Sequence, residues 1–366
     1  MRPLASTWTG MLVLLAVFVA LPLVASAQQN VDSVAGECQR LLVYRDAAGK
    51  EQPVRSAADW RLRRAQILAG MQRVMGDLPD RQKLPEFDLR VVEEKTEPTF
   101  TRLSITIDSG MNDRIPAFVY MPTKKPAGSR SAAILALHQT ANLGKREVDG
   151  QGTPDQGYAR ELAERGYVVL APDYPSFGDY PCDFSDARFG SGTIKGVFNH
   201  MRCVDLLAAR PDVDAERIGV IGHSLGGHNA MFLAAFDERV KVVVASCGWT
   251  PFHDYYGGNL KGWASPRYMP RLRSEFALSA DRVPFDFYEL VAAFAPRSFL
   301  SISPLHDDNF DVRGIRKAIP VARQVYQLLG ADAALEVRYP DCAHGFPTAE
   351  RQAAYEFLDK HLRHVR

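Results

Sequence analysis

The chain has 366 residues, of which 46% are hydrophobic and 24% charged, enough apolar material for one large globular domain or two small ones. Its 44 Lys and Arg residues nearly balance its 43 Asp and Glu residues, so no net field favours nucleic acid or an anionic membrane as a partner. The five cysteines lack the C-x-x-C pairs of a zinc site, and no P-loop or H-E-x-x-H motif occurs, so the sequence predicts neither a metal nor a cofactor.

The N-terminus has the pattern of an export signal. Arg2 precedes an apolar run over residues 11–24, and an A-x-A cleavage site ends at Ala27. A membrane anchor is the alternative, but this run is shorter than the about 20 residues that a spanning helix needs. We therefore expect residues 1–27 to be a cleaved signal peptide. The mature protein is then periplasmic or secreted, without a stable membrane span.

The next segment predicts a helix and a hairpin. Residues 56–75 carry apolar side chains at helical spacing, and Ser56 is placed to cap this helix. Apolar and polar residues alternate over 103–107, and a second apolar run over 115–121 follows a turn, which is typical of a β-hairpin with one buried face. We expect residues 28–130 to form an N-terminal extension that packs on the core.

From residue 131 onward, short apolar runs alternate with helical segments. The predicted strands are residues 132–137, 168–171, 218–221, 240–246, 299–303 and 335–339, and the predicted helices are residues 158–165, 194–209, 228–236, 315–329 and 349–362. Such alternation indicates an α/β fold, a mostly parallel sheet with helices on both faces, in which ligands bind at the carboxyl ends of the strands. We assign residues 131–366 to this domain.

The segment Gly222-His223-Ser224-Leu225-Gly226 joins a predicted strand directly to a predicted helix. A serine on such a sharp turn is strained, and only glycines let the neighbouring elements pack so closely. The G-x-S-x-G pattern resembles the nucleophile elbow of the α/β-hydrolase family. The resemblance implies an α/β-hydrolase fold and Ser224 as the nucleophile.

Two further phrases, at residues 163–167 and 171–174, are similar to the dienelactone-hydrolase-like and acetyl-xylan-esterase-like branch of that family. Classical dienelactone hydrolases use cysteine as the nucleophile. Ser224 therefore favours the esterases of this group.

A serine nucleophile needs a base that is oriented by a carboxylate. The family order of serine, acid and histidine points to His344, in the loop after the last predicted strand. The acid is expected after strand 299–303, where Asp307 and Asp308 are adjacent. Asp307 has the better spacing, with the apolar Phe310 three residues later. A strand end shifted by one residue would select Asp308.

Acyl transfer also needs two donors for the oxyanion. The resemblance implies the backbone N–H of Leu225 as one of them. The other should come from the loop after strand 132–137, which reads His138-Gln139-Thr140 where many relatives have His-Gly. In this register Thr140 is the donor, with Gln139 as a neighbouring candidate that also reaches substrate, and His138 is expected to hydrogen-bond beneath the loop.

Residues 248–286 are rich in aromatic side chains, including Trp249, Tyr255 and Tyr256. Such a segment is either a cap that binds substrate or a packed cover over the sheet. Aromatic faces suit sugar rings or aryl groups, so these three residues are candidate substrate contacts.

These residues together predict a secreted serine hydrolase that cleaves carboxylic esters, carbohydrate-borne or aryl, through an acyl-serine intermediate. A prolyl-oligopeptidase-like peptidase shares this catalytic module and is one alternative. Such enzymes usually carry a large N-terminal propeller, for which the residues before 131 are too few. A non-catalytic binding protein on the same fold is the other alternative, although no member of the triad is missing.

Overall fold

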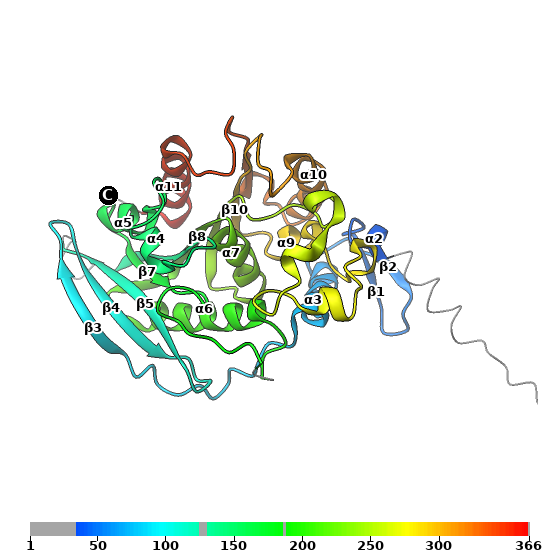
Figure 1. Ribbon diagram of the computed structural model, residues 1–366. Coiled ribbons are helices and arrows are strands. Elements are labelled where there is room, and N and C mark those ends of the chain that lie inside the picture. The colour runs from blue at the N-terminus through cyan, green and yellow to red at the C-terminus, as the bar shows by residue number, and fades with distance from the viewer. Residues whose placement is uncertain (1–33, 124–129, 186–187, 365–366) are drawn as a thin grey trace, which may run out of the picture.

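The computed structural model describes residues 34–123, 130–185 and 188–364, so the predicted signal peptide lies outside the described residues. One large sheet contains the strands β3 (Arg90–Thr96), β4 (Phe100–Asp108), β5 (Arg114–Pro122), β6 (Ser131–Leu137), β7 (Val168–Pro172), β8 (Val213–His223), β9 (Val240–Ser246), β10 (Ser298–Ile302) and β11 (Leu335–Arg338). Their spatial order is β11-β10-β9-β8-β6-β7-β5-β4-β3 (Figure 1).

Helices and short turns connect these strands. The helices are α2 (Val34–Glu37), α3 (Ala57–Met75), α4 (Lys145–Val148), α5 (Tyr158–Glu164), α6 (Gly192–Ala209), α7 (Leu225–Phe236), α8 (Arg271–Ser274), α9 (Phe287–Ala293), α10 (Val312–Leu328) and α11 (Thr348–Leu362). Single 3-10 turns are η1 (Tyr255–Gly258), η2 (Leu260–Trp263), η3 (Ala280–Arg282) and η4 (Asp332–Ala334). A second, two-stranded sheet pairs β1 (Val43–Arg45) with β2 (Glu51–Pro53). No helix within the described ranges is long and apolar enough to cross a membrane.

The parallel part of the sheet is covered on both faces, which confirms the predicted fold class. Neighbouring strands from β7 through β6, β8, β9 and β10 to β11 all pair in parallel. Successive residues of β6 enter opposite cores, because side chains alternate across a strand. Leu135 packs in a core with α3, α6, α7, α9 and α10. Ile134 packs in the core on the other face with α5 and α11.

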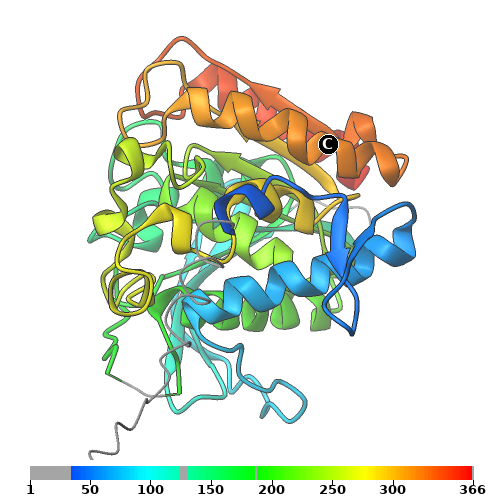
Figure 2. The same cartoon turned by 90° about the vertical axis from the view of Figure 1, so that its right-hand side faces the viewer.

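The predicted helix and hairpin before residue 131 are also confirmed. The Ser56 side chain accepts the N–H of Asp59 and caps α3, which contacts α8 and α9. Figure 2 shows this N-terminal segment in blue beside the yellow segment around residues 270–290. The hairpin β4–β5 does not lie on the sheet but extends it, because β5 pairs antiparallel with β7.

Candidate active site

Ser224 occupies a sharp turn between β8 and α7. Its backbone has φ +54° and ψ −119°, a region that residues with a side chain rarely adopt. A Cβ on Gly222 would lie 2.2 Å from the carbonyl carbon of Gly226, and a Cβ on Gly226 would lie 1.9 Å from the carbonyl oxygen of Leu137. The turn can therefore form only because both positions are glycine, and it presents the serine hydroxyl at the carboxyl end of β8.

Three predicted residues meet at this edge of the sheet in a continuous series of hydrogen bonds. The Ser224 hydroxyl lies 2.9 Å from Nε2 of His344, and Nδ1 of His344 lies 2.9 Å from Oδ2 of Asp307. The three side chains follow β8, β11 and β10, whose parallel pairing places their carboxyl ends side by side. Asp308, the alternative acid, is exposed, and it is Asp307 that the structure brings to His344.

The surroundings of Asp307 keep it ionised. Burial opposes its charge, but three other interactions outweigh burial and lower the pKa of Asp307: the hydrogen bond from His344, the positive charge that this ring carries when it is protonated, and the N–H groups of Phe310 and Asn309. Its Oδ1 accepts these two N–H groups at 3.0 and 2.8 Å. An ionised carboxylate only accepts hydrogen bonds, so the proton of the imidazole lies on Nδ1. Nε2 is therefore free to accept a proton from Ser224.

A buried histidine, His223, packs beside His344. His223 packs nearly parallel to Phe346, and its ring centre lies 5.0 Å from that of His344. Its Nδ1 lies 3.1 Å from the Ser246 hydroxyl. Burial, with the adjacent His344, lowers the pKa of His223 to about 3, so the ring beside His344 is neutral.

A cavity of about 150 Å³ opens over Ser224. Among the described residues its lining is Thr140, Ser224, Leu225, Tyr255, Gly262, Trp263, Tyr268, Asn309 and Phe310. This lining contains aromatic and neutral polar side chains and no charged one. Both expected oxyanion donors, Leu225 and Thr140, thus border the same space as the serine. Leu225 is the first residue of α7, where backbone N–H groups have no partner within the helix.

The other predicted substrate contacts are distributed differently. Tyr255 lines the cavity. Tyr256 is more exposed, and its hydroxyl donates to the side-chain oxygen of Asn309. Gln139 donates to Glu147 at 3.2 Å.

Trp249 does not line the cavity. It is fully buried, and its indole N–H donates to the Ser301 hydroxyl at 2.9 Å. Trp263, Tyr268, Asn309 and Phe310 also line the cavity, although none of them is among the substrate contacts expected from the sequence. Their position in the sequence could have indicated them, since Trp263 and Tyr268 lie in the aromatic segment over residues 248–286, and Asn309 and Phe310 follow Asp307.

Cys247, Asp307 and His344 place a sulfur, an oxygen and a nitrogen within 4.8 Å of one another. A metal would need the thiolate of Cys247. Burial, together with the nearby charge of Asp307, raises the pKa of this thiol well above its ordinary value. Asp307 and His344 of this group bond to each other, and His344 also bonds to Ser224.

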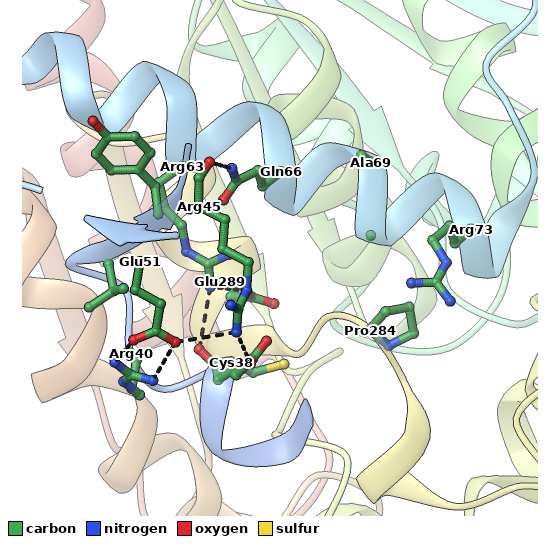
Figure 3. A pocket seen from close by; sticks show the side chains of 14 residues that line it. Cys38, Arg40, Arg45, Glu51, Arg63, Gln66, Ala69, Arg73, Pro284 and Glu289 are labelled. Atoms are coloured by element: carbon green, nitrogen blue, oxygen red, sulfur yellow. Dashed lines mark hydrogen bonds and ion pairs between the residues drawn. The ribbon is translucent and has the colours of Figure 1, made fainter. Parts of the chain in front are cut away.

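A second cavity, of about 390 Å³, lies between α2, the β1–β2 sheet, α3 and the segment that leads to α9. Figure 3 shows charged side chains from these elements paired along its wall. Arg40 bonds to Glu51 at 2.6 Å, and Arg63 bonds to Glu289 at 2.5 Å. None of the predicted site residues lines this cavity.

Comparison with known proteins agrees with this arrangement. The model of the prolyl oligopeptidase family matches residues 157–364. A protein named as a hydrolase, YtaP of Bacillus subtilis (strain 168), is 30% identical over 314 residues, which cover 82% of this chain and 100% of that protein.

Solved structures show the same fold. A glucuronoyl esterase from Solibacter usitatus aligns with a TM-score of 0.65 and 18% identity over 86% of this chain and 95% of its own. An acetyl xylan esterase from Paenibacillus sp. R4 aligns with a TM-score of 0.54 and 18% identity over 80% of this chain and 99% of its own. The chain thus belongs to the prolyl oligopeptidase family and is a hydrolase with the α/β-hydrolase fold.

Proposed function

We propose that the protein is a serine esterase that cleaves carboxylic esters through an acyl-serine intermediate. The Ser224 oxygen attacks the ester carbonyl while Nε2 of His344 takes its proton, and Asp307 stabilises the resulting imidazolium. The N–H groups of Leu225 and Thr140 bind the oxyanion of the tetrahedral intermediate. His344 then protonates the leaving alcohol, and water activated by His344 releases the acid and regenerates Ser224.

The observation that carries this proposal is the pair of hydrogen bonds from Asp307 to His344 and from His344 to Ser224, each of which is 2.9 Å long. Such a series supplies a nucleophile, a base in the correct tautomer and a carboxylate that holds the base. The turn that presents Ser224 supports the same interpretation, because the family's nucleophile occupies this position.

We propose that the substrate is an ester carried by a carbohydrate. A cavity of about 150 Å³ is large enough for a group of roughly the size of benzene, such as a short acyl chain. Its walls contain Tyr255, Trp263, Tyr268 and Phe310, whose faces suit the apolar face of a sugar. Two of the proteins that share the fold are named for glucuronoyl and acetyl xylan esters.

A peptidase is the second candidate, because the matching family model carries the name of prolyl oligopeptidase. In the described residues before 131, the chain forms helices, the β1–β2 sheet and three strands of the main sheet, instead of propeller blades.

One panel of substrates separates the two candidates. It contains acetylated xylan oligosaccharides, methyl esters of glucuronate, longer aryl esters and proline-containing peptide amides. We expect turnover of the sugar esters and none of the amides. Cleavage of the amides alone would favour the peptidase.

We also propose that the protein is exported by the signal over residues 1–27. Cells that express the full chain should release a protein whose N-terminal sequence starts at Gln28. A product that retains the apolar segment would instead indicate an anchor.

A further inference from the structure

The loop that carries Thr140 starts with a buried histidine whose tautomer is determined by its neighbours. Nε2 of His138 lies 2.9 Å from the backbone nitrogen of Tyr174, and Nδ1 lies 2.6 Å from the carbonyl oxygen of Gln139. A backbone N–H only donates and a carbonyl only accepts. Nε2 must therefore carry the lone pair, and Nδ1 must carry the proton that it donates to Gln139.

This second bond acts on the peptide group that contains the candidate oxyanion donor. The carbonyl of Gln139 and the N–H of Thr140 belong to one planar unit, in which a trans peptide points the two groups in opposite directions. Whatever holds the Gln139 oxygen therefore sets the direction of the Thr140 N–H. We propose that His138 is a positioning residue that orients the Thr140 N–H for the oxyanion, an inference that rests on the proposed esterase function.

The surroundings keep this ring neutral and immobile. His138 is 2% exposed and packs edge-on against Phe177. Burial lowers its pKa, although the carboxylate of Asp173 acts in the opposite direction. A protonated ring would lose the acceptor for Tyr174, so the neutral form is the one that fits the loop.

The far end of the loop is fixed by the residue that precedes Tyr174. Asp173 accepts the backbone N–H of Lys145 at 2.7 Å and its ammonium group at 2.6 Å, and both side chains are buried. A Cβ on Gly144 would lie 2.2 Å from the same carboxylate. Two consecutive residues after β7 therefore hold the loop at its start and at its end, and the peptide before Thr140 has little freedom to rotate.

Two substitutions separate the two bonds of His138. The amide of His138→Asn can place an N–H near the position of Nδ1 and still donate to Gln139. The amide of His138→Gln reaches the position of Nε2, where its oxygen can accept from Tyr174, but it leaves the Gln139 carbonyl without its donor. His200→Asn is the matched control, because His200 is equally buried and lies near Tyr174 but forms no bond to this loop.

We expect His138→Gln to lower kcat on an aryl acetate by about 10²- to 10³-fold with KM little changed, the effect of losing one oxyanion donor. His138→Asn should retain kcat within about tenfold of the wild type, and His200→Asn should leave kcat unchanged. Equal kcat in the wild type and both His138 variants, or a loss in His138→Asn alone, would overturn the proposal.

A second measurement needs no variant. Nitrogen-15 NMR of the wild-type protein should show a protonated Nδ1 and an unprotonated Nε2 for His138, and the opposite tautomer would overturn the inference even if a variant fails to fold. The controls also separate this inference from the esterase function. A wild type that neither hydrolyses esters nor reacts with a fluorophosphonate contradicts the proposed esterase function. An active wild type whose His138 variants keep the wild-type kcat contradicts only the role of His138.

Discussion

Asp307→Asn tests how the side chain of Asp307 supports the proposed base His344, because it replaces the carboxylate by an amide of almost the same shape. The remaining amide oxygen still accepts the N–H groups of Asn309 and Phe310, which Oδ1 now holds at 2.8 and 3.0 Å. The amide nitrogen then faces Nδ1 of His344 at the site where the carboxylate oxygen lies 2.9 Å away. Because two N–H donors cannot bond to each other, the imidazole moves its proton to Nε2. In that tautomer it cannot accept a proton from Ser224.

We expect kcat to fall by about 10⁴-fold, which corresponds to roughly 5.4 kcal/mol of transition-state stabilisation at about 1.36 kcal/mol per tenfold change. KM should change little, since Asp307 does not line the cavity. Steady-state kinetics on a small aryl ester measure both constants, with the exposed Asp308→Asn as the matched control. A kcat of Asp307→Asn within tenfold of the wild type, or a large loss of kcat in Asp308→Asn, would refute this reasoning.

Three further predictions concern packing and pH. Gly226→Ala places a Cβ 1.9 Å from the Leu137 oxygen, so we expect thermal unfolding to show a loss of at least roughly 1–3 kcal/mol in the free energy of unfolding, as in an overpacked core, together with loss of activity. A fully active and stable variant would contradict the close contact. Burial raises the pKa of Asp286 from 3.8 to about 7, so its contribution to the stability of the fold is present below about pH 4 and is lost as the pH rises through 7. The melting temperatures at pH 5 and pH 8 should therefore differ less in Asp286→Asn than in the wild type, and an equal or larger difference in the variant would contradict the raised pKa. Trp249→Ala should cost about 3–5 kcal/mol in urea unfolding with KM unchanged, whereas Tyr255→Ala should raise KM, and the reverse pattern would place Trp249 at the substrate.

The elements from residue 131 onward could be predicted because their environment leaves a clear pattern in the sequence. A strand such as β7 is buried along its whole length, so it is a continuous apolar run. The glycines around Ser224 could be interpreted for a similar reason, since a close approach of two backbones excludes every other residue type.

Other elements lack such a pattern. Every residue of β3 is exposed, because this strand pairs only with β4 at the edge of the sheet. Without a buried face there is no alternation to detect. Every residue of α9 is buried, so this helix has no polar face, and its one local signal is the capping box that Asp286 forms with Glu289.

The candidate site shows the same division. The order of Ser224 and His344 along the chain is a feature of the sequence, but the choice between Asp307 and Asp308 depends on where β10 ends. The roles of the aromatic residues are harder still to predict from the sequence. Trp249 and Tyr255 lie in the same segment, yet one packs in the core and the other borders the cavity, which residue type alone does not determine.

The central claim is that Ser224 is the nucleophile, and covalent labelling tests it most directly. The purified protein is treated with an active-site fluorophosphonate, digested and analysed by mass spectrometry, while esterase activity is followed in parallel. We predict a single adduct on the peptide that contains Ser224, formed in step with the loss of activity, and neither adduct nor turnover in Ser224→Ala. Ester hydrolysis that survives Ser224→Ala, or an adduct on another residue, would contradict the account.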